Sequence, residues 1–95
     1  MNSSSWFVIV NPASGSGKTR ERWKKIKSEL RKRELAFEFG LTQYSGEEAS
    51  LTVSALKKGY QKLIVVGGDG TLQKVISGVY SQERTARNKV LIGVT

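Results

Sequence analysis

A glycine-rich loop directly after a short apolar run constrains the fold of this chain more than any other feature. The run Leu63-Ile64-Val65-Val66 contains three β-branched residues and predicts a buried strand. It leads into Gly67-Gly68-Asp69-Gly70-Thr71, which has three glycines in four positions. Glycine tolerates a positive φ and has no Cβ, so this backbone can turn sharply and approach a bulky anion closely.

The end of this loop predicts the start of a helix. Thr71 is of a residue type that caps helices, and the unpaired N–H groups and the dipole of a helix start favour negative charge. Asp69 adds a single carboxylate within this anion-attracting loop. We therefore predict that the loop binds a metal-bridged nucleotide rather than a bare phosphate.

Strands are predicted at four places along the chain. The continuous apolar run at 6–10 predicts a strand that is buried on both faces, and the apolar run described above belongs to a strand at 62–66. Alternation of apolar and polar residues at 35–41 predicts a strand with one more polar face, as at the edge of a sheet. A fourth strand is expected at 89–95, after a polar loop at 81–88.

Helices are predicted between these strands. The first covers 19–33, with apolar residues at helical spacing: Trp23, Ile26 and Leu30. Ser45-Gly46-Glu47-Glu48 has the form of a capping box and opens a second helix, which Gly59 closes. The apolar face expected for this second helix consists of Ala49, Val53 and Leu56. A third helix follows the glycine loop and carries Leu72, Val75, Ile76 and Val79.

The order β-α-β-α-β-α-β predicts an α/β fold with right-handed crossovers. We expect a three-layer α/β/α, Rossmann-like parallel sheet of about four strands, whose lateral order the sequence leaves open. In such a sheet the strand-to-helix loops emerge at the carboxyl edge, where ligands bind. Loops at 11–18, 42–46 and 67–71 share that edge and are rich in Gly, Ser, Thr or Asn. Together they are predicted to cradle one nucleotide, although a generic turn or simple helix capping explains the first two equally well when each is taken alone.

Residues 16–19, Ser-Gly-Lys-Thr, resemble the end of a P-loop. That motif requires a glycine where this chain has Pro12. Proline lacks an N–H and fixes φ near −65°, which impairs a phosphate-binding nest at its first turn. A P-loop is therefore a minor alternative, and Lys18 can still approach a phosphate as a point charge.

Composition excludes several kinds of chemistry. The chain has no cysteine and no histidine, which rules out disulfides, thiolate metal sites and histidine-based catalysis. No apolar segment approaches the roughly 20 residues that span a bilayer, and residues 3–10 lack the basic flank of a signal peptide. A cytoplasmic location is the expectation.

The net charge of +8 is concentrated in one segment, because nine of the sixteen basic residues lie at 18–33. The simplest interpretation is the solvated face of an amphipathic helix. A peripheral contact with an anionic membrane surface is an alternative. Nucleic acid is not expected as a partner, because Trp23 is the only aromatic residue in the segment and its spacing puts it on the apolar face.

Two ordered motifs resemble the diacylglycerol kinase catalytic domain family, which includes bacterial lipid kinases and sphingosine and ceramide kinases. They are Asn11-Pro12-Ala13-Ser14-Gly15 after the first strand and Gly67-Gly68-Asp69-Gly70-Thr71 after the third. The second motif is shared with the related NAD kinases, and the first favours the lipid kinases. The likeness runs from about Trp6 to Thr95, nearly the whole chain.

The resemblance implies ATP-dependent phosphorylation of a lipid hydroxyl with Mg²⁺. It implies that Asp69 is the catalytic residue that organises the metal–phosphate charge, and it assigns no metal ligand. The residues that it implies for cofactor binding are Asn11, Ser14, Gly15, Thr42, Gly67, Gly68, Asp69, Gly70 and Thr71. Among these, Thr42 is similar to a threonine that contacts ATP in bacterial relatives.

The chain departs from the family pattern after the glycine loop. The family commonly has a hydrophobic residue, Asn and Glu where this chain has Leu72-Gln73-Lys74, and Asn-Gly where it has Ser77-Gly78. Lys74 reverses a charge, which favours the alternative of a non-catalytic regulatory or scaffold relative. An NAD kinase-like enzyme is a further alternative.

Family members are several times longer than this chain. They carry a further Gly-Thr-x-Asn-Asp motif and a β-rich domain that supplies the acceptor contacts and the catalytic base. Residues 1–95 are therefore expected to be the N-terminal nucleotide-binding part of a lipid kinase catalytic domain, truncated before that second domain. The resemblance implies that the lipid substrate binds outside these residues and that they are inactive alone.

Overall fold

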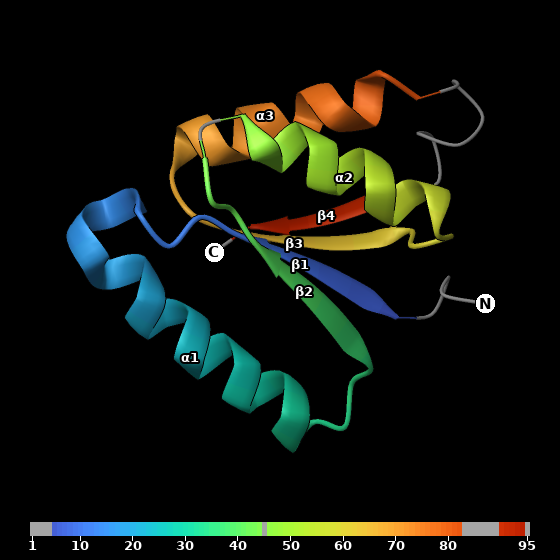
Figure 1. Ribbon diagram of the computed structural model, residues 1–95. Helices are drawn as coiled ribbons and strands as arrows, with labels where there is room; N and C mark the ends of the chain where they lie inside the picture. Colours follow the sequence, from blue (N-terminus) through green and yellow to red (C-terminus); the bar gives the residue numbers. More distant parts are fainter. Residues whose placement is uncertain (1–4, 45, 83–89, 95) are drawn as a thin grey trace.

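The computed structural model describes residues 5–44, 46–82 and 90–94. Within them, a four-stranded parallel sheet is covered by helices on both faces (Figure 1). The elements are, in chain order, β1 (Trp6–Val10), the 3₁₀ turn η1 (Ser14–Gly17), α1 (Lys18–Lys32), β2 (Phe37–Leu41), α2 (Glu47–Lys57), β3 (Lys62–Val66), α3 (Asp69–Tyr80) and β4 (Leu91–Val94). The predicted three-layer α/β fold is confirmed.

The strand order across the sheet is β2-β1-β3-β4. The chain steps outward from β1 to β2, crosses back to β3 and then continues outward to β4, so its direction reverses between β1 and β3. This reversal is a topological switch point, the place where open α/β sheets bind ligands. Val10 and Val66, the last residues of β1 and β3, are paired there. The indication that β2 is an edge strand is confirmed.

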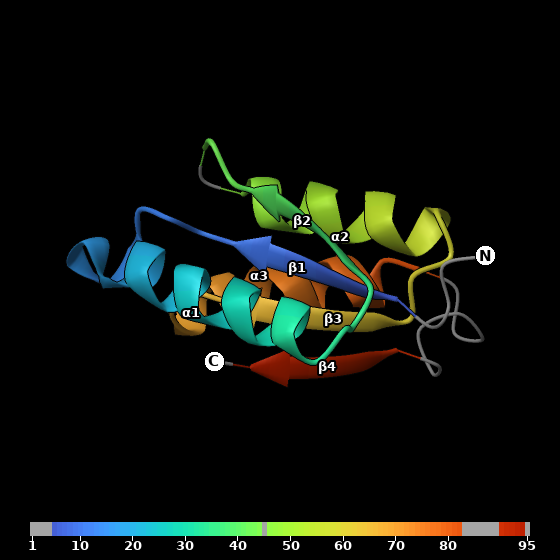
Figure 2. The same ribbon diagram turned by 90° about the horizontal axis from the view of Figure 1, so that it is seen from below.

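The core has two halves because successive side chains of a strand point to opposite faces. Figures 1 and 2 show α1 on one face of the sheet and α2 with α3 on the other. The buried residues on the α1 face are Val8, Val10, Trp23, Leu30 and Val66. Those on the opposite face are Ile9, Ala55, Tyr60, Leu63, Val65, Val75 and Val79. The expectation that β1 is buried on both faces is confirmed.

Both α1 and α2 end in a left-handed residue. Glu34, just past α1, has φ 57°, and the N–H of Leu35 donates to the carbonyl of Leu30 at 2.9 Å. Leu35 was predicted to begin a strand, but it closes the helix instead, and β2 starts two residues later. Gly59 closes α2 as predicted, with φ 97° and the N–H of Tyr60 donating to the carbonyl of Ala55. This is the Schellman arrangement of a helix end.

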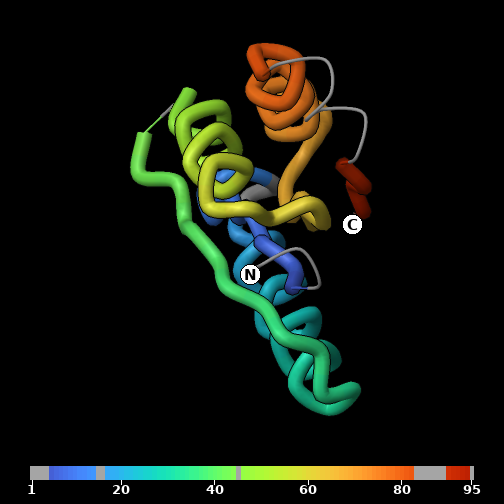
Figure 3. Tube along the Cα trace, turned by 90° about the vertical axis from the view of Figure 1, so that its right-hand side faces the viewer, coloured from blue at the N-terminus to red at the C-terminus, as the bar shows by residue number. Residues whose placement is uncertain are grey.

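The predicted apolar face of α2 is rotated from the one that the structure buries. Ala49, Val53 and Leu56 are only partly buried, whereas the fully buried residues are Glu48, Thr52 and Ala55. The reason is the close packing of α2 against α3, which lie side by side in Figures 1 and 3. The space available there suits short side chains, and the hydroxyl of Thr52 is satisfied by donating to the carbonyl of Glu48 at 2.7 Å.

The fourth strand is present where it was predicted, within the residues that the structure describes. Residues 91–94 of the strand expected at 89–95 form β4, which pairs in parallel with β3. Residues 89 and 95 lie outside the described residues, as do 83–88 of the predicted polar loop. The remaining loop residues, Ser81 and Gln82, form a turn after α3.

Candidate functional site

Three strand-to-helix loops meet at the carboxyl edge of the sheet, on either side of the switch point (Figure 1). Backbone hydrogen bonds continue the sheet into them. The N–H of Asn11 donates to the carbonyl of Val66 at 3.0 Å, and the N–H of Thr42 donates to the carbonyl of Val10 at 2.9 Å. The loops after β1, β2 and β3 are thereby held in register, as the sequence predicted.

The side chain of Asn11 joins all three loops. Its Oδ1 accepts a hydrogen bond from the N–H of Ala13 at 3.2 Å, which makes a tight turn after β1. Its Nδ2 donates to Oγ1 of Thr71 at 3.2 Å and to Oε2 of Glu48 at 3.5 Å. One amide therefore connects the loop after β1 to the first turns of both α2 and α3.

The hydroxyl of Ser14 shapes the first loop from within. It donates to the carbonyl of Asn11 at 3.1 Å and lies 2.8 Å from the hydroxyl of Thr19, which is fully buried. Gly15 lies in the 3₁₀ turn, and Gly17 precedes α1 with φ 89°. Lys18, the cation considered above for a P-loop, is exposed at the start of α1. The polar groups predicted to line a nucleotide here thus also hold the loop in shape.

The glycine loop differs from its predicted conformation in two ways. The helix begins at Asp69 rather than after Thr71, and Gly68 precedes it without any side-chain cap. Capping by Thr71 was therefore wrong: this residue lies within the first turn, is 3% exposed and accepts the bond from Asn11. Neither Gly67, Gly68 nor Gly70 has a positive φ, so the loop does not use the conformational freedom that glycine offers.

The three glycines of the loop lie in two kinds of environment, one tightly packed and two open to solvent. A Cβ at Gly67 would lie 2.6 Å from Oγ1 of Thr71, so only glycine lets the strand end fold against that side chain. A Cβ at Gly68 or Gly70 would meet nothing within 4 Å, and both residues are exposed. By helix geometry the first N–H groups of α3 have no intrahelical partner. Small exposed residues around Asp69 leave these N–H groups accessible to an anion.

Glu48 is the site residue that sequence reasoning missed. Its side chain is 1% exposed, and its Oε1 accepts a hydrogen bond from the N–H of Gly46 at 3.2 Å. Gly46, with φ 94°, precedes α2, so the glutamate half of the predicted capping box is present but reaches Gly46. Ser45, the other half, lies outside the described residues. The signal that could have revealed Glu48 is its i, i+4, i+7 spacing with the buried Thr52 and Ala55.

A cavity of about 200 Å³ opens between these loops. The residues that line it are Asn11, Ala13, Thr42, Gln43, Tyr44, Glu48 and Lys74. Thr42 is 9% exposed and therefore presents its side chain to the cavity rather than to bulk water. Lys74 brings a cation to the same wall. Two predicted nucleotide-binding residues, Asn11 and Thr42, thus share one concave surface.

The carboxylates of this edge suit a cation that is shared with a ligand. Among residues 5–44, 46–82 and 90–94, no three His, Cys, Asp or Glu side chains gather where they could hold a metal ion. Mg²⁺ is commonly bound through one or two carboxylates together with substrate phosphates. Asp69, exposed at the start of α3, fits a single-carboxylate contact of that kind.

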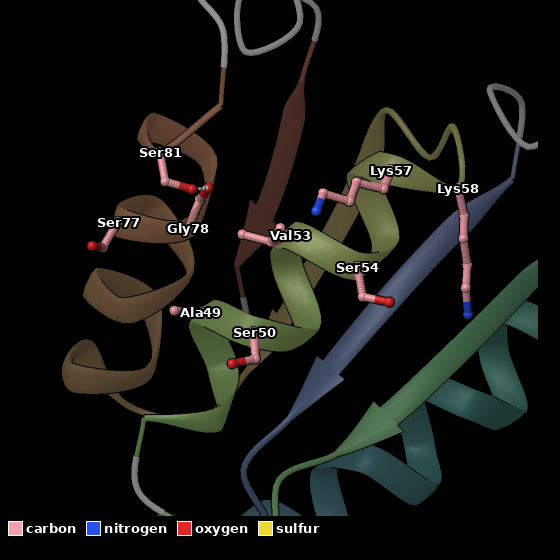
Figure 4. Close-up of a pocket in the computed structure, with 9 residues that line it drawn as sticks. All are labelled: Ala49, Ser50, Val53, Ser54, Lys57, Lys58, Ser77, Gly78 and Ser81. Carbon is pink, nitrogen blue, oxygen red and sulfur yellow. Dashed lines mark hydrogen bonds between the residues drawn. The ribbon is translucent and has the colours of Figure 1, made fainter.

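A larger cavity lies elsewhere, on the outer side of α2 and α3 (Figure 4). It has a volume of about 670 Å³ and is lined by Ala49, Ser50, Val53, Ser54, Lys57, Lys58, Ser77, Gly78 and Ser81. None of these is a predicted site residue, and none carries an acid for phosphoryl chemistry. The smaller cavity at the loops is therefore the better candidate for the functional site.

A parallel sheet with this strand order and with polar loops at its switch point defines a doubly wound α/β protein. A model of the diacylglycerol kinase catalytic domain family matches residues 5–94, so the chain belongs to this family.

Similar proteins agree with this assignment. The chain is 37% identical over 79 residues to "Putative lipid kinase YtlR" of Bacillus subtilis, covering 80% of this chain and 26% of that protein. It is 32% identical over 72 residues to a diacylglycerol kinase of Staphylococcus carnosus, covering 76% of this chain and 24% of that protein. The chain therefore spans about a quarter of the length of these two relatives.

The fold also matches solved structures. One is titled "A putative diacylglycerol kinase from Bacillus anthracis str. Sterne", with a TM-score of 0.79 and 21% identity. The match covers 99% of this chain and 32% of that one. At this level of identity the likeness shows the fold alone, and it extends over every element described above.

Proposed function

We propose that these residues form the N-terminal nucleotide-binding part of a kinase that transfers the γ-phosphate of ATP to a lipid hydroxyl. The observation that carries this proposal is the joining of three loops through Asn11 beside the exposed Asp69, in a chain of the diacylglycerol kinase catalytic domain family. The names of the relatives, lipid kinase and diacylglycerol kinase, support a lipid as the acceptor.

Phosphoryl transfer depends mainly on positioning and on neutralising charge, which requires little covalent chemistry from the protein. In this proposal the N–H groups at the start of α3, next to Gly68 and Gly70, bind the phosphates. Asp69 is the catalytic residue and holds Mg²⁺, which neutralises charge on the phosphate oxygens when bound. Asn11, Ser14, Gly15 and Thr42 form the nucleotide side of the cavity.

Two alternative functions are compatible with a ligand site at the carboxyl edge of the sheet. An NAD kinase-like enzyme shares the glycine loop, but the first-loop motif and the relatives' names favour a lipid. A non-catalytic regulatory or scaffold relative is favoured by Lys74, whose cation lines the cavity where family members commonly have glutamate. The lipid itself is proposed to bind outside residues 1–95, which we expect to be inactive alone.

Nucleotide binding by this chain tests the proposal directly. Titration of ¹⁵N-labelled protein with ADP and Mg²⁺ is expected to shift the amide resonances of residues 11–17 and 67–71 and to leave those around 53–58 unchanged. If millimolar Mg·ADP shifted no loop resonance, the proposed nucleotide site would be wrong. Radiolabelled phosphate transfer by the full-length protein, with diacylglycerol or NAD as acceptor, separates the lipid kinase from the NAD kinase and from a non-catalytic relative.

We also propose that the cationic side of α1 makes a peripheral contact with anionic membranes. Eight of its basic residues and the adjacent Arg33 lie at 18–33, and all except the half-buried Lys27 are exposed. No helix in the described part of the chain is long and apolar enough to cross a bilayer. Because most of the exposed side chains of α1 are cationic, the contact is proposed to be electrostatic, worth about 1 kcal/mol for each basic residue near the surface.

Vesicle sedimentation is expected to show binding to phosphatidylglycerol and not to phosphatidylcholine, weakening as salt rises. The double variant Lys24→Gln, Lys25→Gln is expected to bind anionic vesicles about 30-fold more weakly, because two basic residues are lost. Lys57→Gln, on a helix of the opposite face of the sheet, serves as the control. Equal binding by all three proteins would exclude α1 as the membrane contact.

A further inference from the structure

The buried carboxylate of Glu48 has no role in the function proposed above. A carboxylate that is 1% exposed is costly to bury unless hydrogen bonds satisfy it. Both of its oxygens are engaged: Oε1 accepts from the N–H of Gly46, and Oε2 accepts from Nδ2 of Asn11. Its position at the loop edge, rather than in the apolar core, indicates that these two bonds serve the site.

We propose that Glu48 is a positioning residue, whose carboxylate orients the side-chain amide of Asn11 and through it fixes Thr71 and the glycine loop. The proposal rests on the nucleotide site proposed above and adds what holds that site in shape. Glu48 itself does not touch the phosphates. Its effect passes through two hydrogen bonds, which Nδ2 of Asn11 donates to Oε2 of Glu48 and to Oγ1 of Thr71.

The chemistry of the amide sets its orientation. Oδ1 of Asn11 accepts from the N–H of Ala13, so Nδ2 must point toward Thr71 and Glu48. A donor in that position requires acceptor atoms nearby. The carboxylate of Glu48 supplies two acceptor oxygens, one for Nδ2 of Asn11 and the other for the N–H of Gly46. A glutamine at position 48 has only one acceptor oxygen. Its NH₂ group would therefore face either Nδ2 of Asn11 or the N–H of Gly46, and two donors cannot form a hydrogen bond with each other.

The position of Thr71 decides the shape of the glycine loop. Thr71 is 3% exposed, and its side chain occupies the space where a Cβ of Gly67 would lie. The loop therefore folds directly over this side chain before Asp69 begins α3. A shift of Thr71 would move the loop backbone and the first N–H groups of α3, which are the proposed phosphate-binding groups.

A reciprocal exchange of the two partners tests this chain of contacts. E48Q places an NH₂ donor opposite another donor, and N11D places a second carboxylate beside that of Glu48. Each change breaks a hydrogen bond that holds the site, so each single variant is expected to weaken Mg·ADP binding about tenfold. In the double variant the new glutamine donates to the new aspartate and still accepts from Gly46. Thr71 can then donate its hydroxyl proton to the aspartate. In the double variant the amide resonances of residues 67–71, measured without nucleotide, are expected to return to their positions in the original protein. Rescue is judged on these resonances and not on Mg·ADP affinity, because N11D places a carboxylate in the proposed nucleotide site.

Glu47→Gln is the matched control, because it removes the same charge from the same helix turn. The carboxylate of Glu47 accepts from the N–H of Gln43 and does not contact Asn11. We expect this variant to bind Mg·ADP as the original protein does. Calorimetry gives the affinities, and thermal unfolding of the same samples shows whether the loss of binding exceeds any loss of stability.

Each outcome has a definite meaning. Absence of rescue in the double variant, with normal binding by the original protein, would overturn the positioning role. No binding by the original protein would instead contradict the proposed function. If either single variant failed to fold, hydrogen exchange of the side-chain amide of Asn11 in the original protein remains decisive: it must be slower than that of the exposed Gln73. Equal exchange rates would also overturn the proposal.

Discussion

Replacing Asp69 with asparagine is expected to lower kcat for phosphoryl transfer by the full-length enzyme about 100-fold. In the proposed mechanism Asp69 would hold Mg²⁺ against the phosphates, and asparagine has nearly the same shape but lacks the negative charge for that role. Because Asp69 is exposed at the first position of α3, the change is expected to cost less than about 1 kcal/mol of stability, from its interaction with the helix dipole. The loss of rate would then reflect chemistry rather than unfolding.

The measurement is kcat over a range of Mg²⁺ concentrations, with thermal unfolding on the same preparations. Glu47→Gln, which removes a carboxylate charge from the start of α2, is expected to keep the original kcat. An Asp69→Asn enzyme with the original rate and an unchanged dependence on Mg²⁺ would show that Asp69 is not the catalytic residue.

The largest effect on stability is expected from Gly78→Val. A Cβ at this position would lie 2.9 Å from the backbone oxygen of Ala49 and 2.9 Å from Cβ of Thr52. Ala49 lies in the first turn of α2, and its backbone oxygen cannot move aside without shifting that helix. We expect overpacking to destabilise the protein by about 3 kcal/mol and to lower Tm by more than 10 °C, about what such a loss means for a domain of this size.

Thermal and urea unfolding check this prediction, with Ser77→Val as the matched control. Ser77 is the exposed neighbour of Gly78 on α3, so the same substitution there adds a β-branched residue without a clash. It is expected to change stability by less than about 0.5 kcal/mol. Similar losses for both variants would mean that a β-branched residue on α3, rather than contact with α2, causes the loss of stability.

The alternation of strands and helices could be predicted because each element carries its own local pattern. Trp23 shows this well: its spacing alone placed it on the apolar face, and its ring packs against Phe37 and Phe39 of β2. The lateral strand order could not be predicted, because pairing between strands far apart in the sequence leaves no local pattern. Only the more polar face expected for β2 gave part of that answer.

The candidate site was predictable in its location and less so in its geometry. Loops after parallel strands must meet at one edge, so Asn11 and the glycine loop were expected near each other. The backbone angles of the loop could not be inferred, because glycine permits a positive φ without requiring one. Glu48 and Thr52 were missed because polar residues usually indicate an exposed face, and here hydrogen bonds with Asn11, Gly46 and the α2 backbone allow them to be buried.

The central place of β1 in the sheet has a consequence for folding during synthesis. Residues Val8, Ile9 and Val10, which are fully buried in the folded protein, are synthesised before either strand that flanks them in the sheet. Their neighbours on the two sides are β2 and β3, which come much later in the chain. Until Lys62–Val66 has emerged, the most apolar segment of the protein has one flank uncovered. Such late, non-local pairing slows folding and leaves apolar surface exposed in the nascent chain.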